Sequence, residues 1–104
     1  MEGVFQQMIL EAARLQVKRG QEEDFEVAFK RASILLSGMG GYISHQLQRC
    51  LEVRGQYLLL VQRRDLESHT VGFRQSVEYQ EWKALLHHFY EPFPTVEHFE
   101  EVKL

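Results

Sequence analysis

Several residue types are scarce or missing in this chain of 104 residues. Asparagine is absent, which excludes any mechanism that needs an asparagine side chain. Cys50 is the sole cysteine, so no intrachain disulfide can form, and a reducing cytoplasm is the expected location. No apolar run approaches the ~20 residues of a membrane-spanning helix, and the first residues lack the pattern of a secretory signal. We therefore expect no membrane association.

Basic residues are also too few to form a nucleic-acid-binding surface. The chain has 12 Lys and Arg against 15 Asp and Glu, a formal net charge of −3. The basic pairs Lys18-Arg19 and Arg63-Arg64 are short and far apart in the sequence, whereas nucleic-acid binding normally needs a concentrated basic patch. The length predicts a single domain over residues 1–104, with its core in residues 8–102.

The longest apolar run, Tyr57-Leu58-Leu59-Leu60-Val61, predicts a strand that is buried on both faces. Two helices can cover only one face of a single small sheet. Leucines left on the other face would form an apolar patch that monomers rarely tolerate. We therefore predict a homodimer that pairs through this face of the sheet.

The order of patterns along the chain predicts an α+β, ferredoxin-like fold. A helix opening at Gln21 has a buried stripe of Phe25, Phe29, Ala32 and Leu36. Asp65 and Ser76 are candidate N-caps of two further helices. Strands are expected at residues 8–17, 42–51, 56–62 and 95–102. The resulting order is β-α-β-β-α-β with an antiparallel sheet.

Alternation and helix position give two further expectations. In the second strand, Ile43, His45 and Leu47 share one face, and Tyr42 lies on the other. His87 and His88 are adjacent, so they diverge on a helix, and we expect both at its solvated end.

Five segments carry a resemblance to a known family. They are Val17-Lys18-Arg19-Gly20-Gln21, Gly41-Tyr42, Tyr57 to Val61, Leu66 to Tyr79, and Val96-Glu97-His98-Phe99. With them the chain resembles the antibiotic biosynthesis monooxygenase family from about residue 8 to 102. The resemblance implies a dimeric α/β barrel made from two ferredoxin-like protomers, each with a pocket between helices and sheet. Known activities include metal- and flavin-free oxidation of aromatic polyketides, quinol oxidation and haem cleavage.

The resemblance argues against haem cleavage here. Haem-cleaving members use an asparagine, a tryptophan and a histidine at positions where this chain has Ala13, Arg63 and Lys83. A lysine at the last position removes the neutral imidazole that would bind iron. We therefore predict that the protein uses no cofactor.

Three residues are the candidate catalytic groups. His69 shares a predicted helix face with Leu66 and Phe73, and its near-neutral pKa suits proton abstraction from a phenol or hydroquinone. The alternative interpretation of His69 is a structural histidine that is hydrogen-bonded to a backbone carbonyl. Trp82, with Tyr79, either stacks on an aromatic substrate or belongs to the core. Arg63 either meets an anionic or carbonyl group of a ligand or forms an internal ion pair with Glu11.

Further residues are candidate substrate contacts. They are His45, Tyr79, Phe73, Glu11 and His98. His45, His69 and His98 are also the right residue types for a three-histidine metal site, but no tight ligand spacing supports one, and we predict no metal.

The favoured function is a cofactor-independent monooxygenase that oxidises an electron-rich aromatic or quinol in the protomer's pocket. One alternative is a non-catalytic dimeric module that binds a small hydrophobic ligand. Another is isomerase or cyclase chemistry on a polyketide, which needs acid–base residues but no oxygen.

Overall fold

The computed structural model describes residues 8–65 and 76–104. The elements in these residues, in chain order, are β1 (Ile9–Gln16), α1 (Glu22–Ser37), β2 (Tyr42–Arg49), β3 (Gln56–Arg63), α2 (Val77–Leu86), the short 3₁₀ helix η3 (His87–Phe89) and β4 (Val96–Glu100). The predicted strands at 8–17, 42–51 and 95–102 were one or two residues too long at one or both ends. The helix predicted to start at Asp65 lies outside the described residues.

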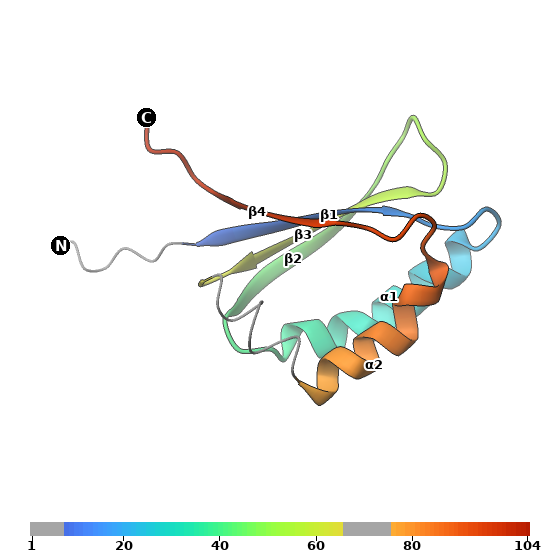
Figure 1. The fold of residues 1–104 in the computed structure, drawn as a ribbon, viewed down its shortest axis with the longest axis horizontal. Coiled ribbons are helices and arrows are strands. Elements are labelled where there is room, and N and C mark those ends of the chain that lie inside the picture. Colours follow the sequence, from blue (N-terminus) through green and yellow to red (C-terminus); the bar gives the residue numbers. More distant parts are fainter. Residues whose placement is uncertain (1–7, 66–75) are drawn as a thin grey trace.

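The four strands form one antiparallel sheet in the order β2-β3-β1-β4. Both helices pack against the same face, and the other face is left without a helix (Figure 1). This arrangement confirms the predicted ferredoxin-like fold. Within the described residues, no helix is long and apolar enough to cross a membrane.

The core lies between α1, α2 and the covered face of the sheet. The predicted α1 stripe of Phe25, Phe29, Ala32 and Leu36 is buried. Alternate β3 residues point toward it, and the Phe25 and Tyr57 rings lie 4.9 Å apart. Burying each large apolar side chain stabilises the fold by roughly 1.5–3 kcal/mol.

Short polar and glycine signals fix where the elements begin and turn. Ser76 caps α2, as predicted: its Oγ accepts a hydrogen bond from the Tyr79 backbone N–H at 3.1 Å. Gly55 turns β2 into β3 with φ of +82°, and a Cβ there would lie 3.0 Å from the Val17 carbonyl oxygen. Both the positive φ and this close contact require glycine at position 55 of the turn.

A β-bulge corrects the predicted faces of β2. The register with β3 shifts between Tyr42, which pairs with Arg63, and Ser44, which pairs with Gln62. The bulge leaves Ile43 39% exposed and turns Tyr42 to the helix side, where its hydroxyl lies 2.6 Å from His45 Nδ1. The prediction that Tyr42 lies opposite His45 was wrong, because strict alternation fails across an extra residue.

The open face of the sheet carries an apolar centre. Ala12 pairs with Leu60 and Arg14 with Leu58, and both leucines stay partly exposed in the protomer. Phe99, which is 49% exposed, extends the patch along β4. The two-sided apolar character predicted for the third strand is confirmed, and the dimeric barrel stays a prediction.

Candidate functional site

A cavity of about 350 Å³ lies between α2 and the covered face of the sheet. Its volume is within the range of small-molecule pockets, ~300–1,000 Å³. Four predicted site residues line it: Glu11, Arg63, Tyr79 and Trp82. Among the described residues, the remaining lining is mainly apolar or aromatic and comes from Ala13, Leu15, Leu36, Leu59, Val61, His87, Tyr90, Phe93, Pro94, Thr95 and Val96.

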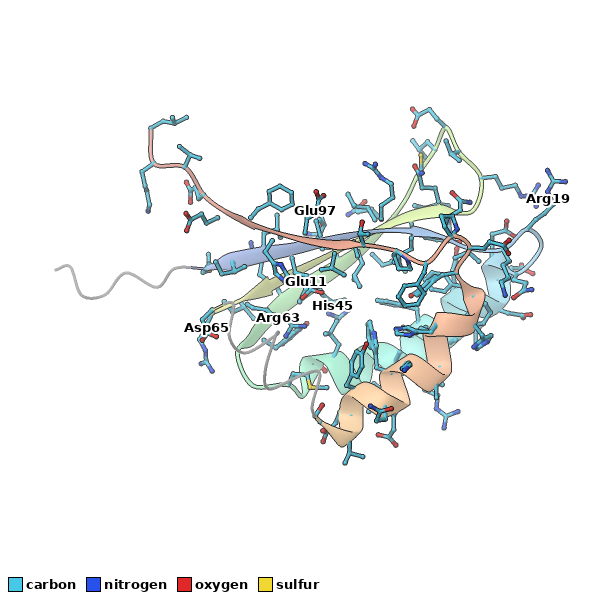
Figure 2. All side chains as sticks on the ribbon, viewed as in Figure 1. Glu11, Arg19, His45, Arg63, Asp65 and Glu97 are labelled. Atoms are coloured by element: carbon cyan, nitrogen blue, oxygen red, sulfur yellow. The ribbon has the colours of Figure 1, made fainter. Side chains whose placement is uncertain are left out.

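A buried ion pair forms the polar part of the sheet wall. Arg63 Nε donates to Glu11 Oε1 at 2.8 Å, and the two residues are 1% and 6% exposed. Glu11 pairs in register with Val61, and Arg63 lies two residues further along β3 on the same face. Figure 2 shows both side chains on the helix side of the sheet, with Glu97 on the opposite side. The internal ion pair weighed for Glu11 and Arg63 is therefore present, and the pair also faces the cavity.

Aromatic side chains from α2 form the helix wall. Trp82 is 8% exposed and meets the Phe29 ring edge-on at 5.8 Å. Tyr79 lies one turn earlier on the same helix and lines the same space. Trp82 is thus both a core residue and a cavity residue, so its two interpretations coincide.

The prediction that His87 lies at a solvated helix end was wrong, because His87 is half-buried and lines the cavity. His87 keeps helical geometry at the end of α2, where its backbone N–H donates to the Lys83 carbonyl, and η3 continues the chain from there. Its ring meets the Phe93 ring edge-on at 4.8 Å. Burial, with help from the positive charge of Lys83, holds the pKa of His87 below its ordinary 6.5. The imidazole is therefore neutral at pH 7; His88, by contrast, is exposed, as predicted.

The sheet register separates His45 from His98. His45 pairs with Val61, Val61 with Glu11, and Glu11 with His98, so both histidines lie on the helix side in one row. Three strand spacings of ~4.8 Å put their backbones about 14 Å apart. One metal ion cannot be held by both, and neither lines the cavity. The sequence left open whether His45 and His98 converge, and the register keeps them apart in this protomer.

His45 has a local role on β2. Its Nδ1 is engaged by the Tyr42 hydroxyl, its ring lies 6.1 Å from that of Phe29, and burial lowers its pKa. Within residues 8–65 and 76–104, no three His, Cys, Asp or Glu side chains are grouped for a metal ion. His69 and Phe73 lie outside the described residues, and their roles stay predictions.

Sequence reasoning missed three cavity residues: His87, Tyr90 and Phe93. Tyr90 is 8% exposed, and burial raises the pKa of its hydroxyl above the ordinary range. A signal for Phe93 was available, since Pro92 and Pro94 on either side of it forbid a continuous helix there. The burial of His87 at the end of α2 had no such signal.

A second polar cluster lies below the β2–β3 hairpin. The Tyr57 hydroxyl donates to Glu26 Oε2 at 2.6 Å, and Arg49 Nη2 donates to the same oxygen at 2.7 Å. These bonds hold the pKa of the Glu26 carboxyl below 4.5, while burial and Glu26 raise the pKa of Tyr57 to about 12. The cluster ties α1 to the sheet and contributes no residue to the cavity.

The fold and cavity define a small ferredoxin-like protein with an aromatic-lined pocket under its helices. The family model for antibiotic biosynthesis monooxygenases matches residues 8–85. This chain therefore belongs to the antibiotic biosynthesis monooxygenase family, as its sequence resemblance predicted.

Individual relatives agree with this assignment. The uncharacterised protein YczJ of Bacillus subtilis (strain 168) is 60% identical over 95 residues, which cover 91% of this chain and 100% of YczJ. A Bordetella bronchiseptica structure, provisionally named an antibiotic biosynthesis monooxygenase, has a TM-score of 0.89 at 35% identity and covers 94% of this chain and 100% of its own. SnoaB, a cofactor-independent oxygenase from Streptomyces nogalater, has a TM-score of 0.71 at 17% identity over 94% of each chain. At that identity SnoaB shows a shared fold alone.

Proposed function

We propose that this protein is a cofactor-independent monooxygenase that oxidises an electron-rich aromatic or quinol in the cavity under α2. The observation that carries the proposal is the composition of the cavity: aromatic rings on one wall and the Glu11–Arg63 pair on the other. Family membership and the fold shared with SnoaB, a cofactor-independent oxygenase, support the same reaction class.

The walls suit the binding of a flat ring. Trp82 and Tyr79 offer faces and edges for offset or edge-on contact, worth about 0.5–1.5 kcal/mol per pair beyond burial. The Arg63 guanidinium is almost fully removed from water. Its charge is therefore weakly screened and stabilises negative charge that develops on the substrate or on reduced oxygen.

The reaction balances without an added reductant. A base removes the proton of the substrate hydroxyl, the electron-rich ring passes one electron to O₂, and the two radicals combine at a ring carbon. The peroxide is protonated, its O–O bond breaks, and water leaves with the hydrogen of that carbon. One oxygen atom becomes a quinone carbonyl and the other becomes water. His69 is the base predicted from the sequence.

The absence of a cofactor is part of the proposal. Haem cleavage is disfavoured by Ala13, Arg63 and Lys83 at the positions that carry its asparagine, tryptophan and histidine. Lys83 is exposed on α2, and Arg63 is bonded to Glu11. Neither offers the imidazole that would bind haem iron.

The open sheet face supports a homodimer. Leu58 and Leu60 lie at its centre with Phe99 beside them, and burying each leucine against a second copy is worth roughly 1.5–3 kcal/mol. We propose that two copies pair through this face in the cytoplasm, with a small aromatic molecule as the only other partner.

Oxygen consumption by metal-stripped protein tests the proposal. Substrates are a panel of anthrones, hydroquinones and catechols, with heat-denatured protein as the control. We expect saturable oxygen uptake that Trp82→Ala abolishes, and that His69→Ala also abolishes if His69 is the base, with circular dichroism confirming that each variant is folded. Unchanged turnover and an unchanged pH profile in His69→Ala would remove His69 as the base.

The alternatives give different results in the same assay. A non-catalytic module for a small hydrophobic ligand binds panel members saturably but consumes no oxygen. An isomerase or cyclase converts a polyketide under argon as fast as in air. Either result would refute the monooxygenase proposal while leaving the cavity as the binding site.

A further inference from the structure

Among the four histidines in the described residues, His87 alone lines the cavity. Its imidazole is bordered by aromatic rings, with centroid distances of 4.8 Å to Phe93, 6.1 Å to Tyr90 and 6.2 Å to Tyr79. These contacts hold the ring in place at the opening of η3. His87 is thus a positioned polar group in an otherwise mainly aromatic part of the wall.

The ring nitrogens of His87 make no hydrogen bond to residues 8–65 or 76–104. The other histidines differ. His45 Nδ1 is engaged by Tyr42, His88 is exposed against Phe89, and His98 faces Glu11 in register on β4. The His87 nitrogens are not among the buried side-chain atoms that lack a partner, so water can reach them, and the hydroxyl of a ligand in the cavity can take the place of that water.

We infer that His87 accepts the hydroxyl proton of a phenol-type ligand bound in this cavity, first as a hydrogen bond and then as the base of the oxidation. The base assignment rests on the proposed function and gives His87 the role that the sequence predicted for His69, so unchanged turnover in His69→Ala would agree with it. The hydrogen bond does not rest on the proposed function, because it requires only that a hydroxylated aromatic molecule binds. Trp82 and Tyr79 then supply the ring contacts, and His87 selects the hydroxyl.

The protonation state of His87 suits this role. Burial and Lys83 keep the imidazole neutral at pH 7, so one ring nitrogen is an acceptor. In the part of the chain that the structure describes, the other charged or titratable groups that line the cavity are Tyr79 on α2, Tyr90 after η3, Glu11 on β1 and Arg63 on β3. Glu11 and Arg63 are bonded to each other, so neither offers His87 a competing permanent partner.

The proton transfer is coupled to oxidation. A phenol has a pKa near ~10 and an imidazole near ~6.5, so the proton stays on the ligand in the resting complex. In the small fraction of complexes that transfer the proton, the O–H bond breaks, its electron pair stays on the ligand, and the proton moves to His87. The resulting anion passes one electron to O₂, and this oxidation draws the proton transfer forward. The imidazolium later returns this proton to the peroxide.

A matched pair of ligands tests the hydrogen bond without turnover. 1-Naphthol and 1-methoxynaphthalene have the same rings, but only the first can donate. Their affinities are measured under argon by calorimetry, with fluorescence of Trp82, the sole tryptophan, as a second readout. We expect wild type to prefer 1-naphthol on the order of five- to tenfold, the effect of one hydrogen bond.

Variants of His87 and His88 show which of the two histidines causes the preference for 1-naphthol over 1-methoxynaphthalene. His87→Phe is expected to abolish it while still binding 1-methoxynaphthalene, which reports a folded cavity. His88→Phe, the matched exposed control, is expected to keep it, and His87→Gln, which retains an acceptor, is expected to restore part of it. The preference in wild type should also fall as pH drops through the lowered pKa of His87.

Other outcomes overturn the inference. An equal preference in His87→Phe and His88→Phe would assign the hydroxyl contact to another group. Failure of both naphthalenes to bind would remove the cavity as an aromatic site. A preference that depends on His87, in a protein that consumes no oxygen with any panel substrate, would refute the oxygenase proposal and leave this hydrogen bond standing.

Discussion

Replacing Glu11 by leucine would leave the Arg63 guanidinium buried without the carboxylate that now accepts from its Nε at 2.8 Å. Arg63 is 1% exposed, so water cannot replace Glu11 without disturbing the core. Breaking a buried ion pair by removing one partner typically costs about 3–5 kcal/mol. A domain of this size has a total stability of about 5–15 kcal/mol. Glu11→Leu should therefore lose a large fraction of the free energy of unfolding.

The matching double variant separates the charge from the packing. Replacing both partners, as Glu11→Leu with Arg63→Met, removes both buried charges, and such exchanges are often neutral or stabilising by roughly 1–4 kcal/mol. We expect the double variant to be more stable than Glu11→Leu alone. The exposed Glu81→Gln change on α2 is the control and should stay within about 0.5 kcal/mol of wild type.

Urea unfolding at one fixed protein concentration measures all four proteins, because any dimerisation makes stability depend on concentration. A loss below about 1 kcal/mol in Glu11→Leu, the range of exposed ion pairs, would refute the interpretation of a desolvated pair. A double variant as unstable as Glu11→Leu would show that shape, and not charge, makes the pair necessary.

Two further predictions concern the α1 anchor and the open face of the sheet. Tyr57→Phe removes the donor to Glu26 and should cost about 1–3 kcal/mol in urea unfolding at pH 7. Because the folded-state pKa of Glu26 lies below 4.5, the stability difference between wild type and Tyr57→Phe is expected to be constant above pH 4.5. It should shrink as the pH falls through the folded-state pKa of Glu26. A stability difference that does not change with pH would contradict this prediction. Leu60→Arg should convert a dimer to monomers in sedimentation velocity, whereas Leu51→Arg, at a residue that is 91% exposed, should not. Equal sedimentation of both variants would exclude the open face as the interface.

The sequence predicted the parts of the fold that depend on regular periodicity. The α1 stripe from Phe25 to Leu36 has helical spacing, and its residues are buried as expected. The apolar run from Tyr57 to Val61 predicted a strand with apolar residues on both faces, and the alternation of β3 confirms it. In these segments local pattern and tertiary packing require the same arrangement.

The errors lie where local geometry departs from a regular period. One extra residue at the β2 bulge turned Tyr42 to the helix side, and the end of α2 borders the cavity, so that His87 is half-buried there and not solvated. Strand register, which spans residues far apart in the sequence, separated His45 from His98. Of the predicted site, Glu11, Arg63, Tyr79 and Trp82 do meet at one cavity, because each lies on a face that simple alternation or helical spacing identifies.

Isotope labelling tests the central claim most directly. Metal-stripped protein is given ¹⁸O₂ and an anthrone or phenol that it consumes, and the product is analysed by mass spectrometry. A cofactor-independent monooxygenase places one labelled oxygen atom in the quinone and the other in water, at one O₂ per substrate. Product without label, or none formed until metal is restored, would contradict the proposed function.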